Sequence, residues 1–214
     1  MRSFLAQRGT KKGDLSKFIE QAVQKEVFAQ IVADVEARNS TKTDIEMQDV
    51  IGDALRQVRA EMWAKPAIKK EKSLNLAVRI IIDSNVLISA FVKSDSPPNQ
   101  LVNAWWDGRF ELVTGATQIE EIVRVARYPQ IQEIVKPAEI GWLINRLRDR
   151  AIIIGRLPRV EVSVDPADNY LFASAQSSDA AYLVSGDKDG VLAIPKHGAC
   201  QTVRAKQMVA ILKI

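Results

Sequence analysis

The stretch RIIIDSNVLISAF, residues 79–91, places one aspartate between two apolar runs. The run that ends at Ile82 is short and branched, which is typical of a strand buried on both faces of a parallel sheet. An unpaired charge is strongly disfavoured in such surroundings unless its pKa shifts and it becomes neutral. We therefore expect Asp83 either to cap a local element or to face a cation.

The same alternation of apolar runs and helical patterns continues to the end of the chain. We expect strands at 79–82, 110–113, 151–154 and 181–184, a further strand at 201–203 before a terminal helix, and helices at about 98–107, 116–127, 137–150 and 168–177. Short apolar strands that alternate with helices predict an α/β fold, in which helices cover both faces of a parallel sheet.

Two amphipathic helices are expected before this α/β part. Asp14 is a good N-cap for apolar residues that recur at helical spacing over 15–35. Thr43 and Glu46 form a capping box for a second apolar stripe over 47–62. These stripes need a partner, because helices are marginal without tertiary packing. They either extend the core or wrap a partner as a binding segment.

The chain thus divides into a helical segment at 1–64, a lysine-rich linker at 65–77 and an α/β domain at 78–214. Its 214 residues are 47% hydrophobic and 26% charged, as in an ordinary globular protein. We find no membrane span and no signal peptide, and the single Cys200 suits a reducing compartment, so we expect a cytoplasmic protein. The net charge of +4 mildly favours an anionic partner.

Acidic residues follow several of the predicted strands. Asp83 and Asp187 end strands, Asp165 and Asp168 stand at the mouth of a helix, and Glu120 and Glu121 lie early in another helix. Each could be a helix cap or a turn residue, but groups at the carboxyl ends of parallel strands converge. Clustered carboxylates repel unless a divalent cation lies among them.

The type of cation follows from the ligands at hand. His197 and Cys200 are single and lie near no other ligand, which excludes the usual zinc sites and leaves Mg²⁺ or Mn²⁺. Mg²⁺ favours phosphate in its shell, so a phosphodiester is the expected substrate. A phosphatase is disfavoured, because Asn85 stands where that chemistry needs a second aspartate.

The segments IIIDSNVLISAF, EEIVRVARYPQI, DPADNYLFASAQ and YLVSGDKDG, in this order, resemble the PIN domain of VapC-like toxins over residues 78–214. The resemblance implies an α/β/α sandwich with a parallel sheet and Mg²⁺- or Mn²⁺-dependent cleavage of RNA that leaves a 5′-phosphate and a 3′-hydroxyl. It implies a dimer as well. The implied catalytic and metal-binding residues are Asp83, Glu121, Asp168 and Asp187, with Asn85 and Ser185 in support and Asp165 and Asp189 as near alternates.

The stretch FLAQRGTKKGDLSKFIEQAVQKEVF, residues 4–28, resembles the helix–turn–helix portion of a ribbon-helix-helix antitoxin, with 4–8 as the end of its first helix. The strand that such proteins insert into DNA would precede Met1, so we do not expect DNA binding. The remaining helices would clamp the toxin, in cis or in trans from a second copy.

Met62 and Trp63 are the predicted anchors of this clamp. Arg56 and Arg59 either reach the acids and compete with the metal or stay solvated on the helix, and the usual exposure of arginine favours the solvated state.

The sequence thus predicts a metal-dependent endoribonuclease of toxin type, inhibited by an antitoxin-like segment in the same chain. The alternative is a non-catalytic regulatory protein in which the acids are caps and the helices mediate dimerisation. Trp105 and Trp106 are expected in core or dimer packing, and we assign no role to His197 or Cys200.

Overall fold

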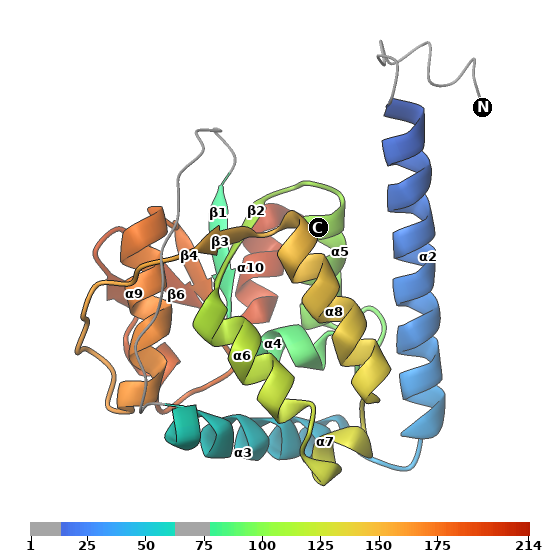
Figure 1. The fold of residues 1–214 in the computed structure, drawn as a ribbon, viewed down its shortest axis with the longest axis horizontal. Helices are drawn as coiled ribbons and strands as arrows, with labels where there is room; N and C mark the ends of the chain where they lie inside the picture. The colour runs from blue at the N-terminus through green and yellow to red at the C-terminus, as the bar shows by residue number, and fades with distance from the viewer. Residues whose placement is uncertain (1–13, 63–77) are drawn as a thin grey trace.

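The computed structural model describes residues 14–62 and 78–214, with side chains from residue 19 onward in the first of these ranges (Figure 1). The predicted linker at 65–77, the predicted anchor Trp63 and the helix end at 4–8 lie outside the described residues.

The α/β domain is built on one six-stranded sheet with the order β3-β2-β1-β4-β6-β5. The strands are β1 (Arg79–Ile82), β2 (Glu111–Gly115), β3 (Ile152–Ile154), β4 (Tyr182–Val184), β5 (Lys196–His197) and β6 (Cys200–Val203). All neighbouring strands are parallel except the short edge strand β5, which pairs antiparallel with β6. Register pairs Ile81 with Val113 on one side and with Leu183 on the other, so β1 is central.

The helices connect these strands and precede them. They are α2 (Asp14–Arg38), α3 (Asp44–Met62), α4 (Ser84–Ser89), α5 (Pro97–Trp106), α6 (Ala116–Val125), α7 (Pro129–Gln132), α8 (Pro137–Arg150), α9 (Asn169–Ser178) and α10 (Ala205–Leu212), with 3₁₀ turns η1 (Pro166–Asp168) and η2 (Val191–Ala193). Among these elements, the predicted strands and helices of the α/β part all appear, and their ends differ from the predicted ones by at most two residues. No helix in the described parts of the chain has the length and apolar content that a membrane crossing requires.

The two faces of the sheet are covered by different helices. Ile80 and Ile82 of β1 pack in the larger apolar cluster with residues of α3 to α8, whereas Ile81 packs in a second cluster with α9. This alternation is what a strand buried on both faces requires. The predicted α/β/α sandwich with a parallel sheet, preceded by two helices, is confirmed.

The helices α2 and α3 pack on the α/β domain of the same chain. Figure 1 shows α2 standing along one side of the molecule and α3 crossing beneath α4 and α6. Phe28 of α2 stacks on Trp142 at a centroid distance of 5.4 Å and meets Phe91 edge-on at 5.1 Å. At the end of α2, the guanidinium of Arg38 donates to both oxygens of Glu139, at 2.8 and 2.7 Å.

Of the apolar stripe predicted over 15–35, the described side chains, from residue 19 onward, are buried only in the second half. Phe28, Val32 and Val35 are buried, but Ile19 and Val23 are 44% and 52% exposed. Most of the stripe over 47–62 is buried, although Val50 and Met62 are only partly so. The capping box at its start forms as predicted, because Thr43 and Glu46 are hydrogen-bonded to each other in both directions.

Candidate active site

The first residue of the site, Asp83, is fixed at the end of the central strand. Its backbone N–H donates to the carbonyl of Val184 at 2.8 Å, which continues the sheet by one residue before α4 begins. Its side chain is fully buried and makes no capping hydrogen bond to α4. Ser185, which follows β4, donates its hydroxyl to Asp83 Oδ2 at 2.7 Å. The cap interpretation is therefore wrong for Asp83, which faces the interior.

Glu121 reaches the same point from α6. It is 1% exposed while Glu120, its neighbour, points outward, so the choice between these two acids agrees with the geometry. Its Oε2 accepts hydrogen bonds from the hydroxyls of Ser84 and Tyr170, the latter at 2.7 Å. Two hydroxyl donors thus orient this carboxylate.

Asp168 closes the group from the start of α9. It is 1% exposed, and its Oδ2 accepts a hydrogen bond of 3.3 Å from the hydroxyl of Ser163. Asp165, the nearby alternate, instead caps η1 by accepting from the backbone of Ala167 at 2.8 Å. Asp168, rather than Asp165, therefore belongs to the buried group.

Asp187 lies at the rim of this group. Its Oδ1 accepts from the backbone N–H groups of Asp189 and Gly190, both at 3.2 Å, which makes the predicted turn. Its other oxygen faces Gly190, where a Cβ would clash with it and would lie 2.7 Å from Asp168 Oδ2. A side chain at position 190 would therefore push the two carboxylates apart, and the turn with glycine there holds Asp187 beside Asp168. Asp189 is exposed.

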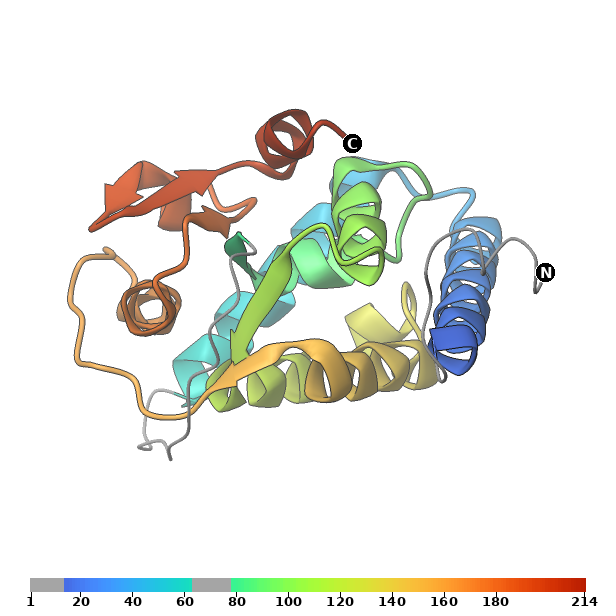
Figure 2. The same cartoon turned by 90° about the horizontal axis from the view of Figure 1, so that it is seen from above.

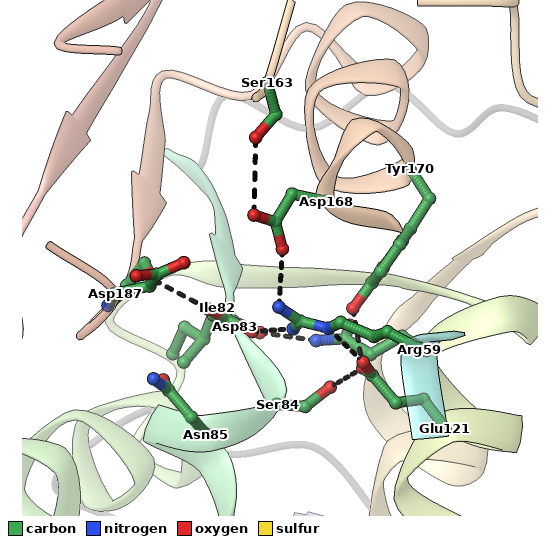
Figure 3. Close-up of polar contacts among 12 residues, drawn as sticks. Arg59, Ile82, Asp83, Ser84, Asn85, Glu121, Ser163, Asp168, Tyr170 and Asp187 are labelled. Carbon is green, nitrogen blue, oxygen red and sulfur yellow. Dashed lines mark hydrogen bonds and ion pairs between the residues drawn. The ribbon is translucent and has the colours of Figure 1, made fainter. Parts of the chain in front are cut away.

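The cation that the acids face is Arg59 of α3 (Figure 3). Its Nη2 donates to Asp83 Oδ1 at 2.6 Å, its Nη1 donates to Asp168 Oδ1 at 2.5 Å, and its Nε pairs with Glu121. The residue is only 8% exposed. The favoured prediction that Arg59 is a solvated helix charge is therefore wrong. Its planar fork of donors matches three carboxylates at once, which exposure statistics for single residues cannot reveal.

The other predicted anchors differ from Arg59. Arg56 is exposed and pairs with Asp53 on its own helix, so it does not reach the acids. Met62 is partly buried against the main apolar cluster. Asn85 lies beside Gly186 rather than in the acid cluster, and its Oδ1 is buried without a hydrogen-bond partner among the described residues.

The electrostatics of the site are unequal between its acids. Burial raises the pKa of Asp168 to about 7. The positive charge of Arg59 lowers this pKa, but the negative charges of Asp83 and Asp187 raise it again. Burial alone would lower the pKa of Arg59, but the charges of Asp83 and Glu121 outweigh burial and raise the pKa well above its usual value. Arg59 therefore stays charged at any pH at which the protein is folded.

Three hydroxyl residues of the site, Ser84, Ser163 and Tyr170, were not predicted. Ser84 follows Asp83 directly and is buried, and a hydroxyl at a strand end was the only signal in the sequence. Burial and the charge of Glu121 raise the pKa of Tyr170 well above its usual value, so its phenol stays a donor.

Trp105 and Trp106 are buried in the core, one of the two places expected for them. Burial raises the pKa of Cys200 to about 11, which makes it an unreactive thiol.

Comparison with known families agrees with this fold. Residues 79–189 match the family described as PIN domain, so the chain belongs to the PIN-domain family. Residues 1–60 match the family described as ribbon-helix-helix domain, which confirms the predicted order of the two parts. Curated proteins and solved structures yield no match.

The pairing of these domains indicates a toxin–antitoxin-like nuclease, since PIN domains are generally nucleases and usually use divalent metals. It also indicates a role with nucleic acid. The expectation that this chain does not bind DNA is not tested by these matches and stays a prediction.

Proposed function

We propose that this chain is a toxin-type endoribonuclease that depends on Mg²⁺ or Mn²⁺ and is held inactive by its own helix α3. The observation that carries the proposal is the position of Arg59. This residue belongs to the ribbon-helix-helix part, yet it pairs with Asp83, Glu121 and Asp168 of the PIN domain. A cation from one domain thus stands where the acids of the other converge.

The donor set fits a hard divalent cation. Carboxylates are the protein ligands that Mg²⁺ and Mn²⁺ prefer, and three of them surround one guanidinium here. The guanidinium supplies one positive charge against three negative ones, so a doubly charged ion neutralises the group more fully. In the described parts of the chain, no three acidic, histidine or cysteine side chains are gathered tightly enough to hold a metal as they stand. The ligands we propose are Asp83, Glu121, Asp168 and Asp187, after the guanidinium withdraws.

When bound, the metal would hold the scissile phosphate and activate water for its hydrolysis. The protein contributes the orientation of the carboxylates. The hydroxyl of Ser185 fixes Asp83, those of Ser84 and Tyr170 fix Glu121, and that of Ser163 reaches Asp168. These hydroxyls lie in the PIN domain itself, so they keep the carboxylates in place after α3 leaves. Partners of this kind typically govern metal affinity.

Inhibition follows from both charge and space. Arg59 satisfies one oxygen of each of three buried carboxylates, so its removal leaves buried charges unpaired. Its side chain also takes the space that a metal and a phosphate would share. Because α3 is tethered in the same chain, its effective concentration at the site is on the order of millimolar.

The test is RNA cleavage by full-length variants in the presence of Mn²⁺. We expect little cleavage by the unmodified chain, clear cleavage by Arg59→Ala, and none by Arg59→Ala combined with Asp83→Asn. Arg56→Ala is the matched control, since it removes an exposed arginine from the same helix, and it should behave as the unmodified chain. If Arg59→Ala is no more active than Arg56→Ala, autoinhibition is refuted. If the Asp83→Asn substitution leaves cleavage unchanged, the nuclease site is misassigned.

Two further points are part of this proposal. The helical segment ends at residue 64 and the PIN domain begins at residue 78, and two chains pair to form a dimer. The exposed apolar residues Ile19 and Val23 on α2 support the pairing of chains, since the described part of the molecule does not cover them. Here α3 contacts the PIN domain of its own chain, which supports inhibition in cis.

A further inference from the structure

A cavity of about 1040 Å³ adjoins the acid cluster on the side of Glu121. Glu121 itself lines this cavity, together with Tyr170, which donates to it. Pockets that take small molecules commonly range over about 300–1,000 Å³, so the space is large enough for a nucleotide. A phosphate held at the acids would place its neighbouring nucleotide at this opening.

The frame of the cavity belongs to the PIN domain. Its walls are the start of α6, the loop 157–164 and the first turns of α9. Only Arg59 and Met62 among its lining residues come from α3, where they close one side. The cavity therefore remains, and opens further, when α3 withdraws.

The loop that forms the outer wall is tied to the acids. The chain between β3 and α9 runs out to the edge of the molecule (Figure 2). Asn169, adjacent to Asp168, accepts hydrogen bonds of 2.9 Å from the backbones of Val162 and Ser163 through its Oδ1. The hydroxyl of Ser163 then reaches Asp168. An occupant that touches this loop is thus fixed in position relative to the acids.

The lining of the cavity suits an unpaired base. Leu157, Val160 and Val162 give it an apolar wall, and Thr117 and Asn169 add polar groups. Val162 is 40% exposed, although it lies in a loop with a fixed backbone. Unstacked bases of single-stranded RNA present apolar faces and polar edges, and proteins bind them in such surroundings.

We propose that this cavity is a nucleobase subsite, which takes the base next to the scissile phosphate of single-stranded RNA. The proposal rests on the proposed nuclease function and adds the source of its nucleotide preference. Met62 and Arg59 then have a second effect, because the end of α3 narrows the entrance to the subsite as well as neutralising the acids.

The test fills the cavity in the full-length Arg59→Ala background. Val160→Trp projects an indole into the space, and Ile211→Trp on α10, which does not line the cavity, is the matched control. Ligand-observed NMR titrations with the four nucleoside 5′-monophosphates and with ribose 5-phosphate measure binding. We expect the control to bind at least one nucleotide and Val160→Trp to bind it at least tenfold more weakly.

Cleavage of a random-sequence RNA pool provides the second readout. We expect the control to prefer one base beside the cut and Val160→Trp to lose this preference, with a KM at least tenfold higher and kcat little changed. Equal binding and equal preference in the two variants would overturn the subsite. Ribose 5-phosphate that binds as tightly as the nucleotides would also overturn it, since the base would then contribute nothing.

The two proposals fail separately. If the Arg59→Ala chain does not cleave RNA, the nuclease proposal fails, while the binding titrations still decide whether the cavity takes a base. If thermal melting shows that Val160→Trp does not fold, Val162→Trp at the exposed rim repeats both measurements.

Discussion

Replacing Arg59 with alanine should change both the stability of the chain and its response to metal. The guanidinium is 8% exposed and pairs with three carboxylates, two of them at 2.6 and 2.5 Å. Breaking a buried ion pair from one side costs about 3–5 kcal/mol, because the partner is left charged and unpaired. The cost here should lie near the lower end of this range, since Asp168, whose pKa is about 7, can take up a proton. At about 1.4 kcal/mol per decade, a loss of about 3 kcal/mol weakens the docking of α3 more than a hundredfold.

The assay is urea denaturation of full-length protein at pH 7.5 with and without Mn²⁺, together with hydrogen exchange of the α3 amides. Without metal, Arg59→Ala should be destabilised by about 3 kcal/mol, and its α3 amides should exchange faster. With Mn²⁺ at a hundredfold excess over its Kd, about 2.7 kcal/mol should return, because the ion binds only the folded site.

The matched control for this prediction is Arg56→Ala. Arg56 is exposed, and among the described residues it pairs with Asp53 alone, so its loss should change stability by less than about 0.5 kcal/mol. Equal stabilities for the two variants, or no stabilisation of Arg59→Ala by Mn²⁺, would refute the idea that the guanidinium stands in for a metal ion.

Three further predictions follow from single contacts. Tyr170→Phe removes one hydrogen-bond donor to Glu121, so the affinity for Mn²⁺ in the Arg59→Ala background should fall by about 10- to 100-fold. Electron paramagnetic resonance measures this affinity, and an unchanged value contradicts the idea that Tyr170 orients Glu121. In the folded state Asp168 keeps its proton up to about pH 7, whereas in the unfolded chain it loses the proton near the ordinary pKa of aspartate. Stability should therefore fall as the pH rises from about 4 to 7. The slope from this group is at most about 1.4 kcal/mol per pH unit, and Asp168→Asn should remove it in denaturation curves; identical slopes contradict the raised pKa. Phe28→Ala empties the aromatic contact of α2 and should cost about 3–5 kcal/mol, whereas Val23→Ala at an exposed position should cost little in the same thermal melts.

The fold was largely predictable from the sequence because its strands carry a strong local signal. The run of isoleucines at 79–82 has the burial pattern of a central parallel strand, and its boundaries agree with the structure. The six-residue helix α4 was not predicted, since it is buried on most sides and therefore shows no amphipathic period. The apolar stripe over 15–35 predicted a longer packed surface on α2 than the described residues show, since Ile19 and Val23 are exposed. A periodic apolar face does not indicate how much of its length is in contact with a partner.

The site was predictable to the extent that its members follow strands. Asp83 and Glu121 could be placed at one edge of the sheet, because parallel strands end together. The burial of Arg59 could not be predicted, since its partners lie 24, 62 and 109 residues further along the chain. The hydrogen bond from Tyr170 to Glu121 could not be predicted either, because an aromatic residue in a helix usually packs in the core.

The position of Arg59 before the domain that it contacts has a consequence for biosynthesis. Translation proceeds from the N-terminus, so the helix that carries the guanidinium leaves the ribosome before the last of the acids, Asp187, has been added. On the proposed function, each ribosome delivers inhibitor and enzyme in equal number and with the inhibitor first. A cell that makes this chain would need no separate supply of protective protein, and toxicity would arise only through an event that pulls α3 away or cuts the chain behind it.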